Sequence, residues 1–156
     1  MDFTYDIWHR LNHTLPFLWS FDNVHHIGVD LDVSPALRFH FGEISLSTLF
    51  RVLQLLVIGP SAGTFLIFET CFAVAAEFHH SNWRLPFRVE RALNRVFVTP
   101  RMHGIHHSVI VQDTDAKYST IFSWWDRLNV RFRMITDAHP VTSEFSAYGD
   151  AAATDI

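Results

Sequence analysis

Histidines gather in five short stretches of this 156-residue chain, HRLNH, VHH, RFH, FHHSN and MHGIHH. These stretches hold ten of the eleven histidines: His9, His13, His25, His26, His40, His79, His80, His103, His106 and His107. Side chains three or four positions apart share one face of a helix. His9 and His13 therefore point together, as do His103, His106 and His107. Each of these sets can hold a metal ion from a rigid support.

The number of clustered imidazoles is too large for one metal ion. A structural zinc site uses about four ligands and a catalytic one about three. Two ions roughly 3.5 to 4 Å apart can share a bridging oxygen species, and ten histidines suit such a pair. The ligand set is rich in nitrogen and contains no thiolate, which suits iron, zinc or copper. The sequence therefore predicts a two-metal site.

Two histidines are interpreted differently from the rest. His139 precedes Pro140 outside every cluster and is interpreted as a surface residue without a role. His79 is interpreted as structural, because adjacent side chains on a helix point in different directions. Metal binding remains the preferred explanation of the clusters taken together, although a single cluster such as HRLNH would also fit a place in a protein core.

The elements that must carry these histidines are predicted to be helices. Residues 2–15 read as a helix that stops at Pro16, since a proline disfavours helical geometry in the residue before it. A turn and a second short helix follow up to His26. Residues 28–43 read as a loop in which Ser34-Pro35 starts a short helix. Residues 111–120 read as a polar loop, and residues 121–134 as a final aromatic-rich element. Its Trp124 and Trp125 are expected to pack or to anchor at an interface.

Residues 44–78 form the most apolar segment of the chain. Gly59-Pro60-Ser61 divides it into two arms of roughly 15 to 17 residues, each shorter than the roughly 20 residues of an ordinary membrane span. Arg51 and Glu69 interrupt the arms. A buried hairpin of a soluble protein would explain the segment. We favour a membrane-embedded helical hairpin in which Arg51 and Glu69 turn toward protein.

The stretch after this hairpin is amphipathic and rich in arginine. Residues 79–100 are expected to form a helix that lies along an interface. Thr99 and Pro100 then predict a helix start, with a capping hydroxyl followed by proline. Five basic residues fall within 18 positions, either on a solvated helix face or on the cytoplasmic side of a membrane: Arg84, Arg88, Arg91, Arg95 and Arg101.

Composition sets limits on the class of protein. Hydrophobic residues make up 49% and charged residues 18%, with fifteen Phe and five Trp, which fits a domain with membrane-embedded parts. The net charge of −4 argues against a nucleic-acid partner. The single Cys71 excludes an internal disulfide. We expect one all-α domain over residues 1–137 and a disordered polar tail over 138–156.

The clusters and their flanking residues, taken in order, resemble a known family. HRLNH, LWSFDNVHH, DVSPALRFHFGE, FHHSNWRLP, VTPRMHGIHHS and SWWDRL follow one another as in the fatty acid hydroxylase and sterol desaturase superfamily. The resemblance runs from about Trp8 to Arg133. It implies an integral membrane protein of helices, with histidine boxes gathered on the cytoplasmic side around a non-haem di-iron centre.

The resemblance also implies an activity and a ligand set. The family uses O2 and two electrons to hydroxylate or desaturate a C–H bond of a lipid such as a sterol or fatty acyl chain. No nucleotide-binding fingerprint such as GxGxxG is present, so an external donor is expected: a cytochrome b5, a ferredoxin or a reductase. The boxes match these metal ligands, with the histidine after Arg-Phe ranked lowest: His9, His13, His25, His26, His40, His80, His103, His106 and His107.

Asp22 is the clearest departure from the family pattern. It stands where relatives usually begin the second box with histidine, and it is either an exchanged ligand or a sign of a weakened site. Relatives also carry membrane helices before the first box, whereas His9 follows only eight residues here. These departures leave a non-catalytic, lipid-binding or assembly subunit as the alternative. A soluble zinc hydrolase is the weakest alternative, since HExxH is absent.

Three further carboxylates are candidates for orienting the ligands. A metal-bound histidine commonly donates its second ring N–H to a carboxylate or carbonyl. Asp113, Asp115 and Asp126 lie near the last box and are considered for this role, with a solvated position as the alternative for each.

Overall fold

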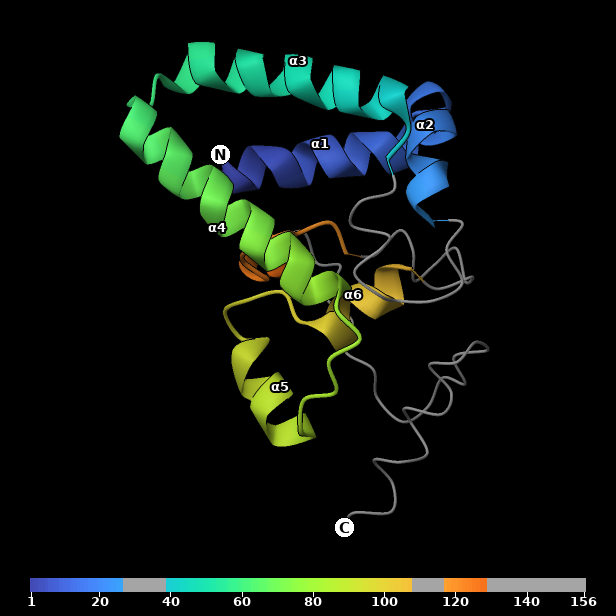
Figure 1. Cartoon of the computed structure of the whole chain (residues 1–156). Coiled ribbons are helices and arrows are strands. Elements are labelled where there is room, and N and C mark those ends of the chain that lie inside the picture. Colours follow the sequence, from blue (N-terminus) through green and yellow to red (C-terminus); the bar gives the residue numbers. More distant parts are fainter. Residues whose placement is uncertain (27–38, 108–116, 129–156) are drawn as a thin grey trace.

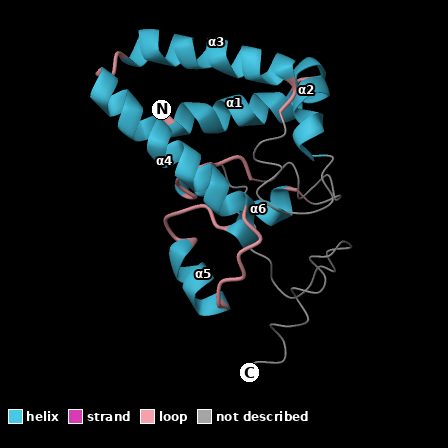
Figure 2. Cartoon of the chain, in the orientation of Figure 1, coloured by secondary structure: helices cyan, strands magenta, loops and turns pink. Residues whose placement is uncertain are grey.

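The structure, a computed structural model, describes residues 1–26, 39–107 and 117–128. Its regular elements in these ranges are helices, as Figure 2 shows, together with an isolated antiparallel bridge between Phe97 and Phe122. The predicted all-α class is confirmed for the described part of the chain. The helices are α1 Asp2–Thr14, α2 Pro16–His26, α3 Phe41–Ile58, α4 Ala62–His80, α5 Phe87–Leu93, α6 Pro100–His106 and α8 Trp124–Leu128.

Some predicted features fall outside the described residues. They are the short helix at Ser34-Pro35, the carboxylates of Asp113 and Asp115, and the tail from residue 138.

The break between α1 and α2 lies where the proline predicted it. Leu15 adopts extended geometry, with φ −97° and ψ 116°, because a residue before proline avoids the helical region. Pro16 then starts α2, since its fixed φ suits a first helical position and that position needs no N–H donor. The chain turns sharply at this point, and α2 crosses the end of α1 (Figure 1).

Helices α3 and α4 are separated at the predicted glycine. Gly59 ends α3 in the left-handed region, with φ 63°, where glycine lacks the Cβ that would clash. Ser61 caps α4, its side-chain oxygen accepting a hydrogen bond from the Thr64 N–H at 3.2 Å. The two helices spread apart from this turn (Figure 1). Helix α3 is long and apolar enough to cross a membrane by length and composition, and it alone meets that criterion within the described ranges.

The N-terminus of α3 lies earlier than predicted. The loop expected to reach residue 43 gives way to helix at Phe41, because His40 caps the helix. The His40 Nδ1 accepts a hydrogen bond from the Gly42 N–H at 3.0 Å, which satisfies one of the N–H groups that a helix start leaves unpaired. Glu43 therefore belongs to the first turn of α3.

Several polar side chains of α3 and α4 face inward, and many of their large apolar side chains face outward. The buried residues of α3 are Glu43 and Gln54. Gln54 donates to the Thr4 hydroxyl at 2.6 Å, and Arg51 forms an ion pair with Glu69 of α4, so these charges do turn toward protein as predicted. The exposed large apolar side chains on the two helices include Leu49, Leu53, Leu56, Val57, Leu66, Ile67 and Val74.

The amphipathic stretch after α4 is less helical than predicted. Helix α4 continues to His80, an irregular segment follows, and α5 covers only Phe87–Leu93. Pro86 explains the interruption, since it lacks an N–H and restricts the residue before it. Helix α6 does begin at Pro100, but the Thr99 hydroxyl does not cap it.

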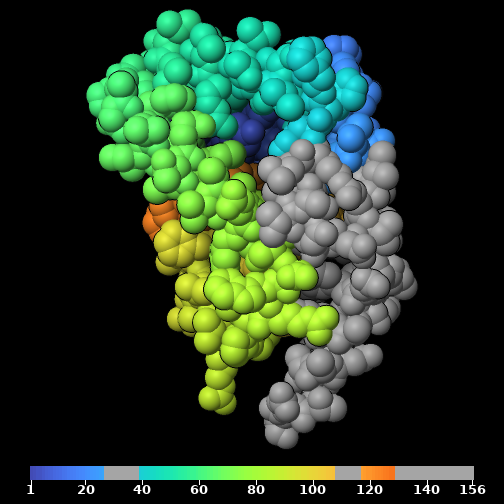
Figure 3. Space-filling model, in the orientation of Figure 1, coloured from blue at the N-terminus to red at the C-terminus, as the bar shows by residue number. Residues whose placement is uncertain are grey.

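The C-terminal described segment, 117–128, packs against the start of α1. Asp2 accepts hydrogen bonds from the backbone N–H groups of Ile121 and Phe122 and from the Trp125 ring at 2.7 Å. Tyr118 is fully buried. On the face drawn in Figure 3, α1 shows as a small dark-blue area between α3 and α4.

Candidate metal centre

The clustered histidines form two compact groups of four. In each group one ligand atom from every histidine lies within 4.8 Å of the others. The first group contains His9, His13, His26 and His106, and the second contains His25, His80, His103 and His107. Eight of the nine histidines carried over from the family pattern are thus brought together, and His40 is not among them.

The first group joins three helices. His9 and His13 lie one turn apart on α1, and His26 is the last residue of α2. His106 reaches them from α6, with its Nε2 3.0 Å from the His9 Nε2. The rings of His13 and His26 meet edge to face, with their centroids 4.8 Å apart.

The second group draws on α2, α4 and α6. His80 ends α4, and its Nε2 lies 3.1 Å from the Nε2 of His25 and 3.0 Å from that of His103. The His107 Nε2 lies 3.0 Å from the His103 Nε2. His103 and His107 are four residues apart, so the predicted shared helical face does place them together.

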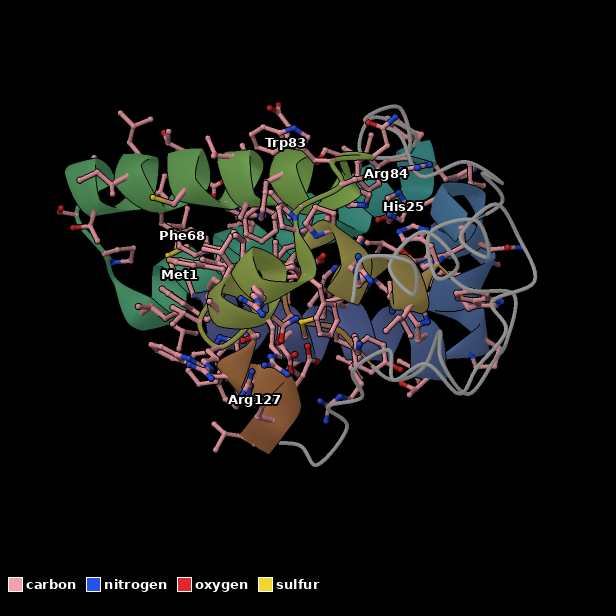
Figure 4. The ribbon with its side chains drawn as sticks, turned by 90° about the horizontal axis from the view of Figure 1, so that it is seen from below. Met1, His25, Phe68, Trp83, Arg84 and Arg127 are labelled. Carbon is pink, nitrogen blue, oxygen red and sulfur yellow. The ribbon has the colours of Figure 1, made fainter. Side chains whose placement is uncertain are left out.

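The two groups are adjacent because α2 and α6 each contribute to both. Neighbouring His25 and His26 go to different groups, and His106 goes to the opposite group from His103 and His107. The rings of His26 and His107 stack with centroids 4.6 Å apart, which places the groups side by side. In the view of Figure 4, His25 lies at the opposite end of the helices from Met1 and Phe68.

Backbone carbonyls set the tautomer of two of these histidines. A carbonyl oxygen can only accept, so the His9 Nδ1 donates to the Tyr118 oxygen at 2.9 Å and the His80 Nδ1 donates to the Ala76 oxygen at 2.7 Å. The Nε2 atoms of both rings are then lone-pair acceptors, and both point at other imidazole nitrogens. Converging lone pairs of this kind suit a cation, so the residues present fit a bound metal.

Burial favours the neutral form of several of these imidazoles. Loss of solvation, aided by neighbouring histidines, lowers the pKa of His9 to about 3 and that of His25 to about 3. The same cause holds the pKa values of His103, His106 and His107 well below the usual range. A neutral imidazole is the form that binds metal, and these groups need to release no proton near pH 7.

Asp22 lies beside the first group. Its Oδ2 is 3.1 Å from the His13 Nε2 and 3.6 Å from the His26 Nε2, and the residue is 3% exposed. Burial opposes its ionisation, but hydrogen bonds from His13 and His26 outweigh burial and keep the pKa of Asp22 below its usual range. The side chain is therefore a carboxylate directed at the same nitrogens that would hold a metal.

His40 and His79 have other roles in this structure. His40 caps α3 and contacts the ring of Phe21, away from both groups. His79 is buried against the second group, with its ring centroid 4.0 Å from that of His103, and it hydrogen-bonds to the backbone of Thr120. The structural interpretation of His79 stays a prediction.

The carboxylate of Asp126 is linked to the candidate metal centre through the backbone of Tyr118. It accepts a hydrogen bond from the Tyr118 N–H at 2.8 Å, and its own N–H donates to the Ser119 hydroxyl. Burial raises the pKa of Asp126 to about 6. The residue therefore holds the segment whose Tyr118 carbonyl orients His9, and its own carboxylate bonds to the Tyr118 backbone. Tyr118 itself was missed by sequence reasoning, since a carbonyl contact leaves no signal in residue type.

Two adjacent sets of four imidazoles on a helical scaffold form a candidate metal centre built from histidine boxes. The family described as fatty acid hydroxylase matches residues 1–129, and the chain belongs to that family. The predicted family membership is thereby confirmed.

Curated relatives include two kinds of lipid-modifying protein. The chain is 32% identical over 124 residues to an ornithine lipid hydroxylase of Rhizobium tropici, an alignment that covers 77% of this chain and 35% of that relative. It is 26% identical over 132 residues to the alkylglycerol monooxygenase of Homo sapiens, covering 82% and 28%. For the Danio rerio alkylglycerol monooxygenase the identity is 28% over 151 residues, covering 90% and 32%. The chain thus spans about a third of these relatives' length, and no solved structure matches it.

Proposed function

We propose that the chain carries the di-iron centre of a membrane-bound oxygenase that uses O2 to hydroxylate a lipid. The observation that supports it most directly is the pair of adjacent four-histidine groups. When bound there, two irons would supply the reduction of O2 that attack on an unreactive C–H bond requires. The ligands in this proposal are His9, His13, Asp22, His25, His26, His80, His103, His106 and His107.

The protein's own part is to hold ligands rigidly and exclude water. The Tyr118 and Ala76 carbonyls fix the ring orientation of His9 and His80, so that each presents its Nε2 inward. His103 and His106 are 3% and 0% exposed, which leaves the interior of the centre shielded from bulk solvent. Shielding of this kind prevents water from consuming a reactive oxidant.

The inverted polarity of α3 supports a place in the membrane. Its interior face carries Glu43, Arg51 and Gln54, whereas Leu56 and Val57 are 78% and 77% exposed. A water-soluble helix would show the reverse arrangement. We therefore place the outer faces of α3 and α4 in lipid, with the turn at Gly59 as the deepest point.

The distribution of charge supports a cytoplasmic metal centre. The histidines lie at the end of the helices opposite the Gly59 turn (Figures 1 and 4). Four exposed arginines follow α4 at that same end, and basic residues next to membrane segments favour the cytoplasmic side: Arg84, Arg88, Arg91 and Arg95.

The relatives favour hydroxylation over desaturation. Both kinds of relative are named for oxygen insertion, as a hydroxylase and as a monooxygenase, and both names denote a lipid. We extend a lipid substrate and hydroxylation to this chain. Electrons are assigned to an external donor of the cytochrome b5, ferredoxin or reductase type. The alternative of a non-enzymatic subunit gains no support from Asp22, because its carboxylate is directed at the histidines.

The proposal is tested on the full chain purified in detergent. Metal analysis should give close to two irons per chain, and lipids from cells with and without the gene should differ by a product that takes up label from ¹⁸O2. One tetrahedral zinc in a folded sample, or label drawn from water in place of O2, would contradict it. A His106→Ala variant provides the matched control, since it removes a ligand and should abolish the product.

A further inference from the structure

The exposed charges in the described part of the chain are almost all positive. Within residues 1–26, 39–107 and 117–128, Glu77 is the one exposed carboxylate, since Glu69 is half-buried and the others are buried. Five arginines are exposed in the same ranges: Arg84, Arg88, Arg91, Arg95 and Arg127. This part of the molecule therefore presents a basic surface, although the whole chain has a net charge of −4.

The exposed arginines gather around α5. Arg88 and Arg91 lie three positions apart on this helix and share a face, and Arg95 follows in the turn after it. Arg127 of α8 donates a hydrogen bond to the Asn94 carbonyl oxygen at 2.8 Å, which places it at the C-terminal end of α5. The positive charge is consequently concentrated on one short helix and the segments next to it.

Aromatic rings lie among these arginines. Trp83 is 65% exposed and Trp124 is 44% exposed. The Trp124 ring N–H donates to the Arg95 carbonyl oxygen at 3.0 Å, and the Arg91 guanidinium lies over the Phe87 ring, 5.7 Å from its centroid. We call this combination of rings and charges the α5 surface and define it by six residues: Trp83, Arg88, Arg91, Arg95, Trp124 and Arg127.

The α5 surface begins where α4 ends. Helix α4, whose outer face is placed in lipid, ends at His80, and Trp83 follows three residues later. At the edge of a membrane, tryptophan rings settle at the level of the lipid headgroups, and guanidinium groups form paired hydrogen bonds with phosphate oxygens. An anionic membrane surface therefore offers a partner to both the rings and the arginines, whereas an acidic protein surface matches the arginines alone.

We propose that the α5 surface binds the phosphate-bearing headgroups of anionic lipids where the chain meets the membrane. The inference rests on the membrane placement proposed for α3 and α4, and not on the identity of the metal. Buried Glu90 of α5 accepts hydrogen bonds from the Arg101 backbone N–H at 2.9 Å and from the Arg101 Nε at 3.0 Å. Arg101 belongs to α6, which carries His103 and His106. Headgroups bound on α5 therefore hold a helix of the metal centre next to the membrane surface.

The test uses the full chain reconstituted in phosphatidylcholine nanodiscs. Dansyl-labelled phosphatidylglycerol, which is anionic, or dansyl-labelled phosphatidylcholine replaces an increasing share of the lipid, and energy transfer from tryptophan to dansyl reports which lipid gathers at the protein. The wild type should reach half of its maximal transfer at about a tenfold lower mole fraction of the anionic lipid. High salt should narrow this difference, because it screens exposed charges.

Two matched triple variants make the result specific to the arginines. Arg88→Gln, Arg91→Gln and Arg95→Gln combined should weaken the binding of labelled phosphatidylglycerol by about fivefold for each charge removed, the contribution of one basic residue near an anionic surface. The same three positions changed to lysine keep the charge and should retain most of the preference. All three side chains are exposed, so both variants should fold, and circular dichroism checks that helix content is retained.

The outcomes separate this inference from the membrane placement on which it rests. Equal transfer to the two labelled lipids by the wild type would overturn the inference and leave the placement of α3 and α4 intact. A preference for the anionic lipid that survives the glutamine variant, while binding of a polyglutamate peptide is lost, would assign the surface to an acidic protein instead. A folded wild-type chain that does not enter the nanodiscs would overturn both the inference and the membrane placement.

Discussion

His9 and Tyr118 are 109 positions apart in the chain, and the His9 Nδ1 donates a hydrogen bond to the Tyr118 carbonyl oxygen at 2.9 Å. This contact links the first and last described segments of the molecule at the candidate metal centre. It commits the His9 ring to one tautomer and one orientation, with Nε2 toward His106. The geometry of the centre therefore depends on a segment that contributes none of the nine proposed ligands.

Asp126→Ala should destabilise the protein and loosen the metal centre together. The carboxylate accepts from the buried Tyr118 N–H at 2.8 Å, and a buried donor that loses its partner costs about 1 to 3 kcal/mol. Thermal unfolding in detergent measures the loss, and metal content after dialysis measures the effect on His9. Asp126→Asn is the control, because its amide oxygen can still accept that hydrogen bond. Equal losses in both variants would show that the charge, and not the acceptor, is what matters.

Acid should destabilise the metal-free protein. The pKa of His9 and that of His25 are lowered to about 3 in the folded chain, against about 6.5 when unfolded. Between those values the unfolded chain binds more protons, so stability is lost as the pH falls through this window, by about 1.4 kcal/mol per pH unit for each such histidine.

The titration of Asp126 has the opposite effect on stability over part of this pH range. Its pKa is raised to about 6, so the folded state takes up a proton before the unfolded state does, and stability from this group increases as the pH falls from about 6 to about 4. Asp6, whose pKa burial also raises, acts together with Asp126 against a larger number of histidines, so the net effect remains destabilising. Melting temperatures of the metal-free chain measured from about pH 7 to about pH 5 should decline, and a flat profile would contradict the buried, neutral histidines.

His40→Ala and His106→Ala should have different effects on metal content. His40 caps α3 and lies outside both groups, so its loss should cost about 0.5 to 2 kcal/mol of stability and leave both metals bound. His106 belongs to the first group and is fully buried, so its loss should release one metal per chain. Metal analysis of the two purified variants distinguishes them. Loss of metal from His40→Ala with an intact fold would place His40 among the ligands after all.

Much of the candidate centre could be predicted because ligand spacing follows helix geometry. The separation of His103 and His107 by four residues encodes their shared face, and Pro16 and Gly59 mark helix ends through their backbone restrictions. What the spacing leaves open is the division into groups. Adjacent His25 and His26 diverge into different groups, and only the crossing of α2 with α4 and α6 decides which goes where.

Contacts between distant segments were beyond sequence reasoning. Residues 28–43 are predicted to be a loop, but Glu43 lies in the first turn of α3. This helix begins early because His40, which the family pattern suggests as a ligand, caps it. Asp2 looks like an ordinary first-turn carboxylate, yet it binds Ile121, Phe122 and Trp125. Such pairings depend on how closely two helices approach each other. At Gly42, for example, α3 lies so near α2 that an added Cβ would come within 2.7 Å of the Phe21 ring. Residue type alone does not predict that distance.

The ion pair between Arg51 and Glu69 provides a test of where α3 and α4 reside. Arg51 also lies over the rings of Tyr5 and Phe72, at 4.9 and 4.8 Å from their centroids. In water, a partly exposed pair of this kind is worth up to about 1 kcal/mol and is screened by salt. In lipid, removing one partner leaves a charge without compensation and costs about 3 to 5 kcal/mol.

A double-mutant cycle in detergent micelles separates the two environments. Arg51→Leu and Glu69→Leu should each lower the melting temperature strongly, whereas the double variant should recover most of the loss, because two leucines suit an apolar setting. A coupling free energy above about 2 kcal/mol that does not change with salt supports the membrane-embedded arrangement. Additive effects below about 1 kcal/mol that shrink in salt would place these faces of α3 and α4 in water, against the proposal made for them.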